Sequence, residues 1–415
     1  MRLLILTQYY PPETGAPQNR LSDLAQRLHQ AGHQVTVLTA LPNYPRGEIF
    51  ENYRGRLLME ESLSGIRTVR TWIYATPRKS FVRRLLNYFS FVFSSFVLGV
   101  WKVRSPEVVI VESPPLFLGL SAWLLAFFKN ARLVFNVSDL WPDSAVAMGI
   151  LSNKMLIRWS RRLEEFLYRR SSLITGQTQG IVDNIQSRFA DKRVALITNG
   201  IDAKRFSLAA IGNQKNSIKE EFGLAGKFVV GYAGLHGLAQ GLDTALQAAR
   251  LLGAREDLAF AFFGDGPEKE KLARFARDCA LGNCHFLPSQ PTARMPAIIG
   301  SFEVALVPLR KLELFKGALP SKMFEAMAAA VPIIVSIDGE ARALVQKAQA
   351  GVFVEPENPE AMAAAIIELY RDPERLTALG MNGRRYVVEH YDRQKIAERF
   401  ERLLIENGCA EMIAA

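Results

Sequence analysis

The feature that most constrains the fold of this chain is a repeated alternation of short apolar strands and amphipathic helices. Residues 3–6 form a continuous apolar run, residues 35–38 form an apolar run interrupted by Thr36, and residues 21–28 between them carry apolar side chains at helical spacing. The same order begins again near residue 227 and continues into a helical pattern over residues 242–252. Parallel strands need a crossover helix between them, so this order predicts two α/β units, each built on a parallel sheet.

A turn signal and a polar segment near residue 200 interrupt this pattern and divide the chain in two. Asn199-Gly200 is a turn signal, and the polar segment 212–216 that follows marks the end of the first domain. We therefore predict a first domain over 1–200, a second over 201–389 and a final helical segment over about 390–415. Further strands are predicted at 133–137, 258–263, 285–287, 304–307 and 333–335, and further helices at 361–370, 376–388 and 394–405.

Composition agrees with two globular domains and indicates an anionic partner. A chain of 415 residues, 49% hydrophobic and 22% charged, exceeds what one core usually supports. Its three cysteines form neither a disulfide framework nor a metal spacing, and the first apolar run is too short for a signal peptide, so a reducing cytoplasm is expected. A net charge of +10 leaves nucleic acid, an anionic membrane and phosphorylated substrates open.

The segment 319–328 carries the clearest local sign of a binding site. Apolar residues recur at helical spacing after Pro320, so a helix is predicted to begin near Ser321, which could cap it. Lys322 then falls in the first turn, where the helix dipole disfavours a cation. A phosphate at this helix start would remove the conflict, and Glu325 could bind sugar hydroxyls beside it. The alternative is an ordinary surface lysine and glutamate.

Two loops after the first strands are predicted to contact ligand, because loops at the carboxyl ends of parallel strands usually do. In the first loop the candidates are Glu13 and Gly15, and the loop lacks the Gly-x-Gly-x-x-Gly pattern of a dinucleotide site. In the second, Asn43, Tyr44 and Arg46 could hold an acceptor. A structural turn around two prolines and a solvent-facing loop are the respective alternatives.

A further acid follows the strand over 133–137. Asp139, beside Trp141 and Pro142, is a candidate polar group of the same site, and a helix N-cap is the alternative. The helix over 158–170 is strongly basic, and a solvated face explains it.

The most apolar stretch, 81–101, has aromatic residues between two basic clusters. Arg78, Lys79, Arg83 and Arg84 come before or at its start, and Lys102 and Arg104 follow it. It is short for a bilayer span and contains polar residues, so we predict that 81–104 lies in the membrane interface, and a core helix is the alternative. A second apolar run, 116–128, could join it.

Together these features resemble glycosyltransferase family 4, whose members have the GT-B fold, and the resemblance covers essentially the whole chain. The resemblance is to the bacterial enzymes that transfer aminosugars or deoxysugars in O-antigen, capsule and exopolysaccharide synthesis. It implies two Rossmann-like domains facing a central cleft, with acceptor on the first, nucleotide sugar on the second, and a final helix packed back on the first. The motifs that carry it are Pro11-Pro12-Glu13-Thr14-Gly15, Asp139-Leu140-Trp141-Pro142, Asn199-Gly200-Ile201-Asp202, Gly231-Tyr232-Ala233-Gly234, Ala239-Gln240-Gly241-Leu242-Asp243, Gly264-Asp265-Gly266-Pro267, Leu319-Pro320-Ser321-Lys322 and Glu325-Ala326-Met327-Ala328.

The resemblance also implies a set of donor-binding residues. Glu325 matches the second glutamate of the family's paired-glutamate motif, whereas Gly317 stands where the first would be. Leu235 or His236, and Gln240, replace an arginine and a lysine found in many relatives. The implied donor-binding residues are Gly15, Gly234, His236, Gly264, Asp265, Phe286, Arg310, Lys316, Leu319, Pro320, Ser321, Lys322 and Glu325.

The implied chemistry is a metal-independent sugar transfer that retains anomeric configuration, with no cofactor. Asp139 and Glu13 are the candidate catalytic residues. The expected donor is a UDP-sugar, with a GDP-deoxysugar as the alternative, and the expected acceptor is a polyprenyl-diphosphate-linked saccharide at the inner leaflet. This places the protein in the cytoplasm, peripherally bound to the membrane. A sugar-nucleotide 2-epimerase of the same fold is a second alternative, and no nucleic-acid-binding motif is present.

Overall fold

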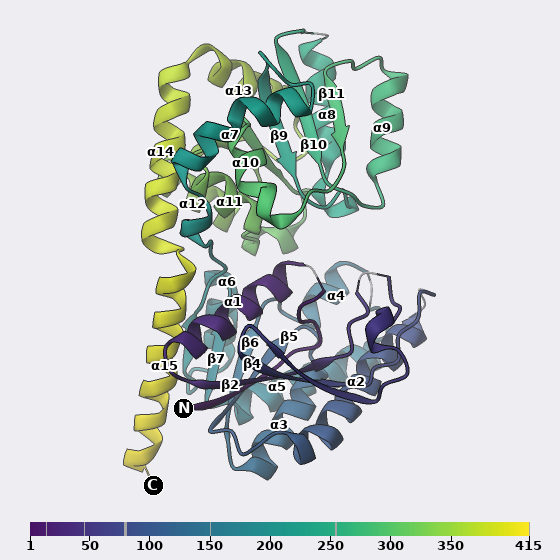
Figure 1. The fold of residues 1–415 in the computed structure, drawn as a ribbon, viewed down its shortest axis with the longest axis vertical. Coiled ribbons are helices and arrows are strands. Elements are labelled where there is room, and N and C mark those ends of the chain that lie inside the picture. The colour runs from purple at the N-terminus through teal and green to yellow at the C-terminus, as the bar shows by residue number, and fades with distance from the viewer. Residues whose placement is uncertain (14, 45, 79–80, 150, 254, 415) are drawn as a thin grey trace. The chain divides into compact units, whose positions relative to one another are not determined.

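The computed structural model describes residues 1–13, 15–44, 46–78, 81–149, 151–253 and 255–414, which form two compact units (Figure 1). The first unit comprises Met1–Thr198 with Gln394–Ala415, and the second comprises Asn199–Arg393. Lys79, one of the basic residues of the predicted membrane segment, lies outside the described residues. Each unit has its own sheet and its own hydrophobic cores.

The first unit is built on an eight-stranded sheet in the order β3-β4-β2-β1-β5-β6-β7-β8. All neighbouring strands are parallel except β3 and β4, which form an antiparallel edge hairpin. Apolar runs do not predict this hairpin, because charged residues interrupt both of its strands. The strands are β1 (Arg2–Leu6), β2 (Gln34–Ala40), β3 (Leu58–Leu63), β4 (Ile66–Thr71), β5 (Val108–Ser113), β6 (Arg132–Val137), β7 (Leu173–Gly176) and β8 (Val194–Leu196).

Helices cover both faces of this sheet. On one face, α1 (Ala16–Gln30) and α15 (Arg393–Ala414) bury Leu28, Phe400 and Leu404 against β1 and β2. The other face carries a layer of four helices whose inner side chains share one core. These are α2 (Phe81–Lys102), α3 (Leu118–Lys129), α5 (Lys154–Arg170) and α6 (Gln179–Arg188), and the short α4 (Asp143–Ala147) follows β6.

The second unit has a six-stranded parallel sheet in the order β11-β10-β9-β12-β13-β14. Its strands are β9 (Phe228–Ala233), β10 (Leu258–Phe263), β11 (Cys284–Leu287), β12 (Val304–Pro308), β13 (Ile333–Ser336) and β14 (Gly351–Phe353). Its helices are α7 (Leu208–Glu221), α8 (Leu242–Leu252), α9 (Lys269–Asp278), α10 (Met295–Gly300), α11 (Ser321–Ala328), α12 (Glu340–Ala348), α13 (Pro359–Arg371) and α14 (Pro373–His390). Short 3-10 helices are η1 (Glu51–Tyr53) in the first unit and η2 (Ala203–Arg205), η3 (Leu238–Gln240), η4 (Thr292–Arg294) and η5 (Glu313–Gly317) in the second.

The two parallel sheets confirm the predicted α/β fold, and α7 corrects one detail of it. The predicted elements over 242–252 and 258–263 coincide with α8 and β10. The polar segment 212–216, however, lies inside α7 instead of between elements. The helix forms because Ile211 and Ile218, two turns apart, are both buried on one face, which a count of polar residues does not detect.

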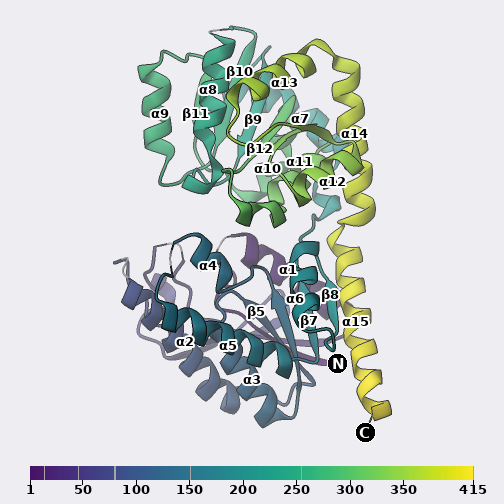
Figure 2. The same cartoon turned by 180° about the vertical axis from the view of Figure 1, so that it is seen from behind.

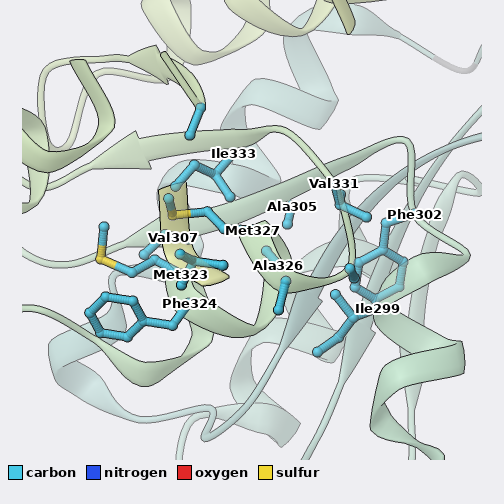
Figure 3. Packing of buried hydrophobic residues seen from close by; sticks show 14 of the residues in the cluster. Ile299, Phe302, Ala305, Val307, Met323, Phe324, Ala326, Met327, Val331 and Ile333 are labelled. Carbon is cyan, nitrogen blue, oxygen red and sulfur yellow. The ribbon is translucent and has the colours of Figure 1, made fainter. Parts of the chain in front are cut away.

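A hydrophobic core fixes the position of α11, the helix predicted to begin near Ser321. Met323, Phe324 and Met327 are fully buried and point into the same cluster as Phe302 (Figure 3). Burial of each large apolar side chain contributes about 1.5–3 kcal/mol. The first turn of α11 is therefore held firmly, although it begins with the polar residues Ser321 and Lys322.

Candidate functional site

The first turn of α11 receives no side-chain cap. Pro320 occupies the N-cap position with extended backbone (φ −62°, ψ 136°), and Ser321 is the first helical residue. This corrects the expectation that Ser321 caps the helix, because a capping residue must itself lie outside the helical conformation. The positive end of the helix dipole is left without a side-chain acceptor, as at an anion-binding helix start.

Lys322 in this first turn is positioned by an aromatic residue of β9. Its Nζ donates a hydrogen bond to Tyr232 Oη (2.6 Å) and lies 3.9 Å from the centre of that ring. The Tyr232 hydroxyl in turn donates to the Leu235 carbonyl (2.6 Å). Burial lowers the pKa of Lys322 to about 7, although the Glu325 carboxylate opposes this shift. Among the described residues no carboxylate lies within ion-pair distance of Nζ, so a bound anion would supply the countercharge.

Glu325, one turn later, is also shielded from solvent. Burial raises the pKa of its carboxyl group, whereas the positive charges of Arg393, Arg205 and Lys322 lower it. Its place beside Lys322 agrees with the predicted pairing of a hydroxyl-binding acid and a phosphate-binding cation.

Three glycines let the neighbouring loops approach closely. Gly234, after β9, has φ +148°, and a Cβ there would lie 3.3 Å from Lys322 Nζ. Gly264, after β10, has φ +141°, and a Cβ there would lie 1.9 Å from the Gly234 carbonyl oxygen. Gly266 has φ +154°, and a Cβ there would lie 2.4 Å from the His236 carbonyl oxygen. Side chains at these positions would force the loops apart.

His236 lies fully buried between these loops. Its ring is 5.8 Å from that of Tyr232 and 6.2 Å from that of Phe286. Neither ring nitrogen has a partner of hydrogen-bonding geometry among the described residues. Burial, then the charge of Lys269, lowers the pKa of His236 to about 4, against a weak backbone interaction with Phe263. The imidazole is therefore neutral at physiological pH and adds no charge to the site.

Two other predicted cations are already paired. Arg310 forms ion pairs with Asp243 (2.8 Å) and Glu357 (2.8 Å). Lys316 lies 2.8 Å from a carboxylate one turn before it and is half exposed. The structure therefore does not bring these residues to Lys322 as free charges, which leaves Lys322 as the principal cation at the helix start.

The remaining predicted donor residues line the loops that follow the strands. Asp265 is exposed, and its carboxylate accepts a hydrogen bond from the Gly266 amide (2.8 Å). Phe286 in β11 stacks on Phe262, with ring centres 5.0 Å apart. Leu319 and Pro320 are partly buried and lead into α11.

In the first unit, Glu13 connects two loops through hydrogen bonds to their backbone amides. One carboxylate oxygen accepts from the amides of Asn43 and Tyr44 (2.8 Å each), and the other accepts from the Tyr10 amide (3.2 Å). Glu13 is buried, and this burial raises the pKa of its carboxyl group. Both oxygens thus hold the two loops together, and the predicted catalytic role of Glu13 stays a prediction.

The other loop candidates differ in accessibility. Tyr44 and Arg46 are exposed, and Tyr44 packs edge-on against Tyr9 at 5.6 Å. The Asn43 side chain is buried and donates to the Leu41 carbonyl (2.9 Å), and its predicted contact with an acceptor stays a prediction. Gly15 occupies the N-cap position of α1 without a side-chain cap.

Asp139 lies just after β6, as predicted, and is not an N-cap, since Pro142 precedes α4. Burial raises the pKa of its carboxyl group, although the Ser144 hydroxyl and the Leu140 amide favour the charged form. The Asp139 carboxyl group is thus partly desolvated, and it lies at the edge of the sheet where the carboxyl ends of the strands meet.

A buried polar cluster lies at the same edge and was not predictable from sequence. Glu112 at the end of β5 is its centre, and it accepts hydrogen bonds from Arg20 and Ser138. Arg20 and Glu112 are 92 residues apart, so no local pattern links them. In the second unit, Lys269 was not predicted either; it donates hydrogen bonds to the carbonyls of Gly264, after β10, and Leu287, at the end of β11. The cluster consists of Arg20, Glu112, Asn136, Ser138, Thr175 and Gln177.

Comparison with known protein families gives two matches that together span most of the chain. Residues 15–200 match the model described as glycosyl transferase 4-like domain. Residues 214–386 match the model described as glycosyl transferases group 1. The boundary between the two matches falls close to the division between the two structural units.

Three similar proteins agree with these matches. WcaI of Escherichia coli (strain K12), named as a glycosyl transferase of colanic acid biosynthesis, is 27% identical over 96% of this chain and 98% of its own length. The sucrose-phosphate synthase of Thermosynechococcus elongatus superposes with a TM-score of 0.77 at 18% identity, over 99% of each chain. Anabaena HepE in complex with UDP-glucose superposes with a TM-score of 0.72 at 16% identity, over 98% of this chain and 100% of the other.

Proposed function

Because this chain belongs to the GT-B glycosyltransferases, with a glycosyl transferase 4-like domain followed by a group 1 domain, we propose that it transfers a sugar from a nucleotide sugar to a lipid-linked saccharide. The proposed donor is a UDP-sugar, and the proposed acceptor is carried on a polyprenyl diphosphate. The proposed pathway is synthesis of a cell-surface polysaccharide, an assignment supported by the name of the E. coli relative WcaI.

The observation that carries this proposal is the uncapped start of α11 with Lys322 beside it. Lys322 is held by Tyr232 and has no ion-paired carboxylate among the described residues, so a diphosphate would complete its environment. The glycines after β9 and β10 provide a close backbone approach, and Glu325 provides an acceptor for sugar or ribose hydroxyls. The Glu325 carboxylate favours a nucleotide sugar over a simple anion, because a simple anion has no hydroxyl groups for it to bind.

The proposed mechanism uses the diphosphate as leaving group and retains anomeric configuration. Negative charge grows on the phosphate oxygen as the bond to the sugar breaks, while the sugar becomes oxocarbenium-like. Fixed amides and the Lys322 ammonium stabilise that growing charge more than the ground state, which lowers the barrier. The departing phosphate takes the proton of the acceptor hydroxyl on the same face, so the step needs neither an enzymic nucleophile nor a metal.

In the first unit, Asp139 is the proposed residue for orienting the acceptor or the sugar. It follows a strand end and is partly desolvated, whereas the carboxylate of Glu13 accepts hydrogen bonds from three backbone amides. Tyr44 and Arg46 are exposed on the neighbouring loop and are proposed acceptor contacts. A lipid-linked acceptor is held in the membrane, so we propose that the protein is cytoplasmic and acts at the inner leaflet.

A GDP-deoxysugar transferase is the second candidate within the same chemistry. A thermal-shift panel of UDP-, GDP-, ADP- and dTDP-sugars separates them, because a ligand that binds the folded state raises its apparent stability. We expect the largest shift with a UDP-sugar. If the largest shift occurs with a GDP-sugar, the donor is a GDP-sugar instead of a UDP-sugar. If an epimer of the nucleotide sugar forms without acceptor, the protein is an epimerase instead of a transferase.

The same panel tests the site itself. Lys322→Ala should weaken binding of the best donor about ten- to a hundredfold, the usual loss for a hydrogen bond to a charged group. The matched control is Lys311→Ala, which removes an equal charge from an exposed residue paired with Glu355. Equal donor affinity in the two variants would show that the diphosphate does not bind at the start of α11.

A further inference from the structure

The outer surface of the helix layer α2–α3–α5 carries many exposed apolar side chains among the described residues. On α2 the exposed residues include Phe93 and Trp101, which are 69% and 84% accessible. The three helices are adjacent, because Phe96 of α2 contacts Phe128 of α3, and Trp123 of α3 contacts Phe166 of α5. Figures 1 and 2 both show them on the same side of the sheet.

The inner face of α2 is tied into the fold. By length and composition, α2 is the one helix among the described residues that could cross a membrane, over Leu85–Lys102. Phe91 is fully buried in the core beneath it, the Ser95 hydroxyl lies 2.8 Å from that of Ser121, and the Asn87 amide donates to the Tyr74 carbonyl (2.8 Å). A helix bound in this way would have to break these contacts to span a bilayer, so its exposed stripe is suited to lying on one.

The middle helix, α3, is apolar on its outer face as well. No charged residue occurs between Leu116 and Phe128, and the last turn of α3, before Lys129, carries Phe127 and Phe128, which are 70% and 61% accessible. Because Phe128 contacts Phe96 of α2, the apolar surface of α2 extends onto α3.

The third helix, α5, adds both aromatic and basic groups. Met155 and Trp159 are exposed near its start, and the Arg162 guanidinium lies 5.7 Å from the centre of the Trp159 ring. Cations occur along the exposed side of the helix, at Lys154, Arg158, Arg162, Arg169 and Arg170, whereas Arg161 beside them is paired with Asp143 (2.9 Å). The sequence alone suggested a solvated face, but its neighbours are the apolar surfaces of α2 and α3.

We propose that α5 joins α2 and α3 in one surface that binds an anionic lipid bilayer, with the aromatic residues inserted at the level of the headgroups and the arginines of α5 on the lipid phosphates. The inference rests on the proposed function only in that a lipid-linked acceptor gives the surface a purpose. An anionic bilayer is the occupant indicated by charge, because a row of arginines on each copy would repel in a second molecule of this chain.

The experiment measures binding of the full chain to phosphatidylcholine vesicles with and without phosphatidylglycerol. We expect binding to require the anionic lipid and to weaken with salt. Arg158→Glu with Arg162→Glu should weaken binding at least tenfold, since each basic residue near an anionic surface contributes about fivefold. The control is Lys271→Glu with Arg274→Glu, two exposed cations on α9 of the second unit.

A second pair of variants separates insertion from charge. Met155→Ser with Trp159→Ser should weaken binding about tenfold without changing net charge. Its control is Leu251→Ser with Met381→Ser, two exposed apolar residues of the second unit. Both α5 variants should keep the donor-induced thermal shift, which shows that they are folded.

Three outcomes would overturn the inference. Vesicle binding by the α5 variants at the level of their controls would exclude α5, and equal binding to neutral and anionic vesicles would exclude charge recognition. A dimer in sedimentation that the α5 variants dissociate, without vesicle binding, would assign the surface to a second copy. The proposed function has a separate test, because loss of nucleotide-sugar binding would contradict it even if vesicle binding persisted.

Discussion

A lysine in the first turn of a helix is unfavourable unless something compensates it, and Lys322 has only partial compensation. The Tyr232 hydroxyl and ring face its ammonium, but burial still lowers its pKa to about 7 from an ordinary value of 10.5. A fraction of the molecules therefore carries a neutral Lys322 near neutral pH. A bound diphosphate favours the charged form, so donor binding and protonation of Lys322 are thermodynamically linked.

This linkage predicts the pH dependence of donor affinity. The bound anion raises the pKa of Lys322, so binding takes up a proton at pH values between the free and the bound pKa. The affinity should fall by up to about tenfold per pH unit as the pH rises above about 7. A nucleotide sugar is the right probe, because its phosphates are diesters and lack the second ionisation near pH 6. Calorimetry in buffers of different ionisation enthalpy measures the proton uptake directly.

The control for this prediction is Lys322→Arg. An arginine stays protonated over the whole range, so its donor affinity should be nearly independent of pH, even if its larger side chain lowers that affinity. A wild-type affinity that is flat between about pH 6 and about pH 9, with no proton uptake, would show that Lys322 is already charged before the donor binds.

Asp139 leads to a kinetic prediction at the same scale. If it orients the acceptor or the reacting sugar, Asp139→Asn removes its charge with little change in shape. Turnover should fall about a hundredfold or more, whereas donor affinity should change by less than about threefold. The measurement is steady-state transfer combined with the thermal shift given by the donor alone. Wild-type turnover in this variant would refute the role.

At the scale of elements, the loops after β9 and β10 depend on glycine. Gly264→Ala would place a Cβ 1.9 Å from the Gly234 carbonyl oxygen at a backbone φ of +141°, so the two loops would have to separate. Overpacking and backbone strain each cost about 1–3 kcal/mol, and the variant should lose roughly 2–5 kcal/mol of unfolding free energy as well as donor affinity. Chemical denaturation followed by far-UV circular dichroism measures the loss.

Gly212→Ala is the matched control. Gly212 lies inside α7, and a Cβ there would have no heavy atom within 4 Å. Because alanine favours the helix, this variant should gain about 0.5–1 kcal/mol and keep its donor affinity. Equal loss of stability in the two variants would mean that loop contact is not what Gly264 provides.

Prediction from the sequence succeeded where the signal was local. The start of α11 and the presence of a cation there follow from residues 319–328 alone, and the structure places the helix start at Ser321. The partners of the predicted cations were not predictable, because Tyr232 and Lys322 are 90 residues apart and Arg310 and Glu357 are 47 apart. Such pairings depend on strand register and loop length, which the sequence does not display.

The same limit explains which contacts of the first unit could not be predicted from the sequence. Glu13 was a reasonable catalytic candidate from its loop, but its three amide donors come partly from a second loop 30 residues away. The strands and the long amphipathic helices carry their own periodicity, so the α/β architecture was predictable almost throughout. The edge hairpin β3–β4 and the helix α7 were not, because their polar residues mask the buried ones.

At the scale of the whole molecule, the chain order and the structural units do not coincide. The chain leaves the first unit at Thr198 and returns to it at Gln394, so α15 completes a core whose other residues lie between Leu3 and Ile197. Phe400 and Leu404 are buried there, and His33 Nε2 lies 2.8 Å from a Glu401 carboxylate oxygen. The stability of the first unit therefore depends on the end of the chain.

This dependence can be measured separately in each unit, because all five tryptophans, Trp72, Trp101, Trp123, Trp141 and Trp159, belong to the first. Phe400→Ala should lower the unfolding free energy reported by tryptophan fluorescence by about 3–5 kcal/mol, the usual cost of such a cavity. Ile405→Ala, at an exposed position of the same helix, should cost less than about 1 kcal/mol. The part of the far-UV circular dichroism transition that fluorescence does not follow should keep its midpoint. If both transitions instead move together in Phe400→Ala, the two units unfold as one cooperative structure, and α15 stabilises the whole chain through the first unit.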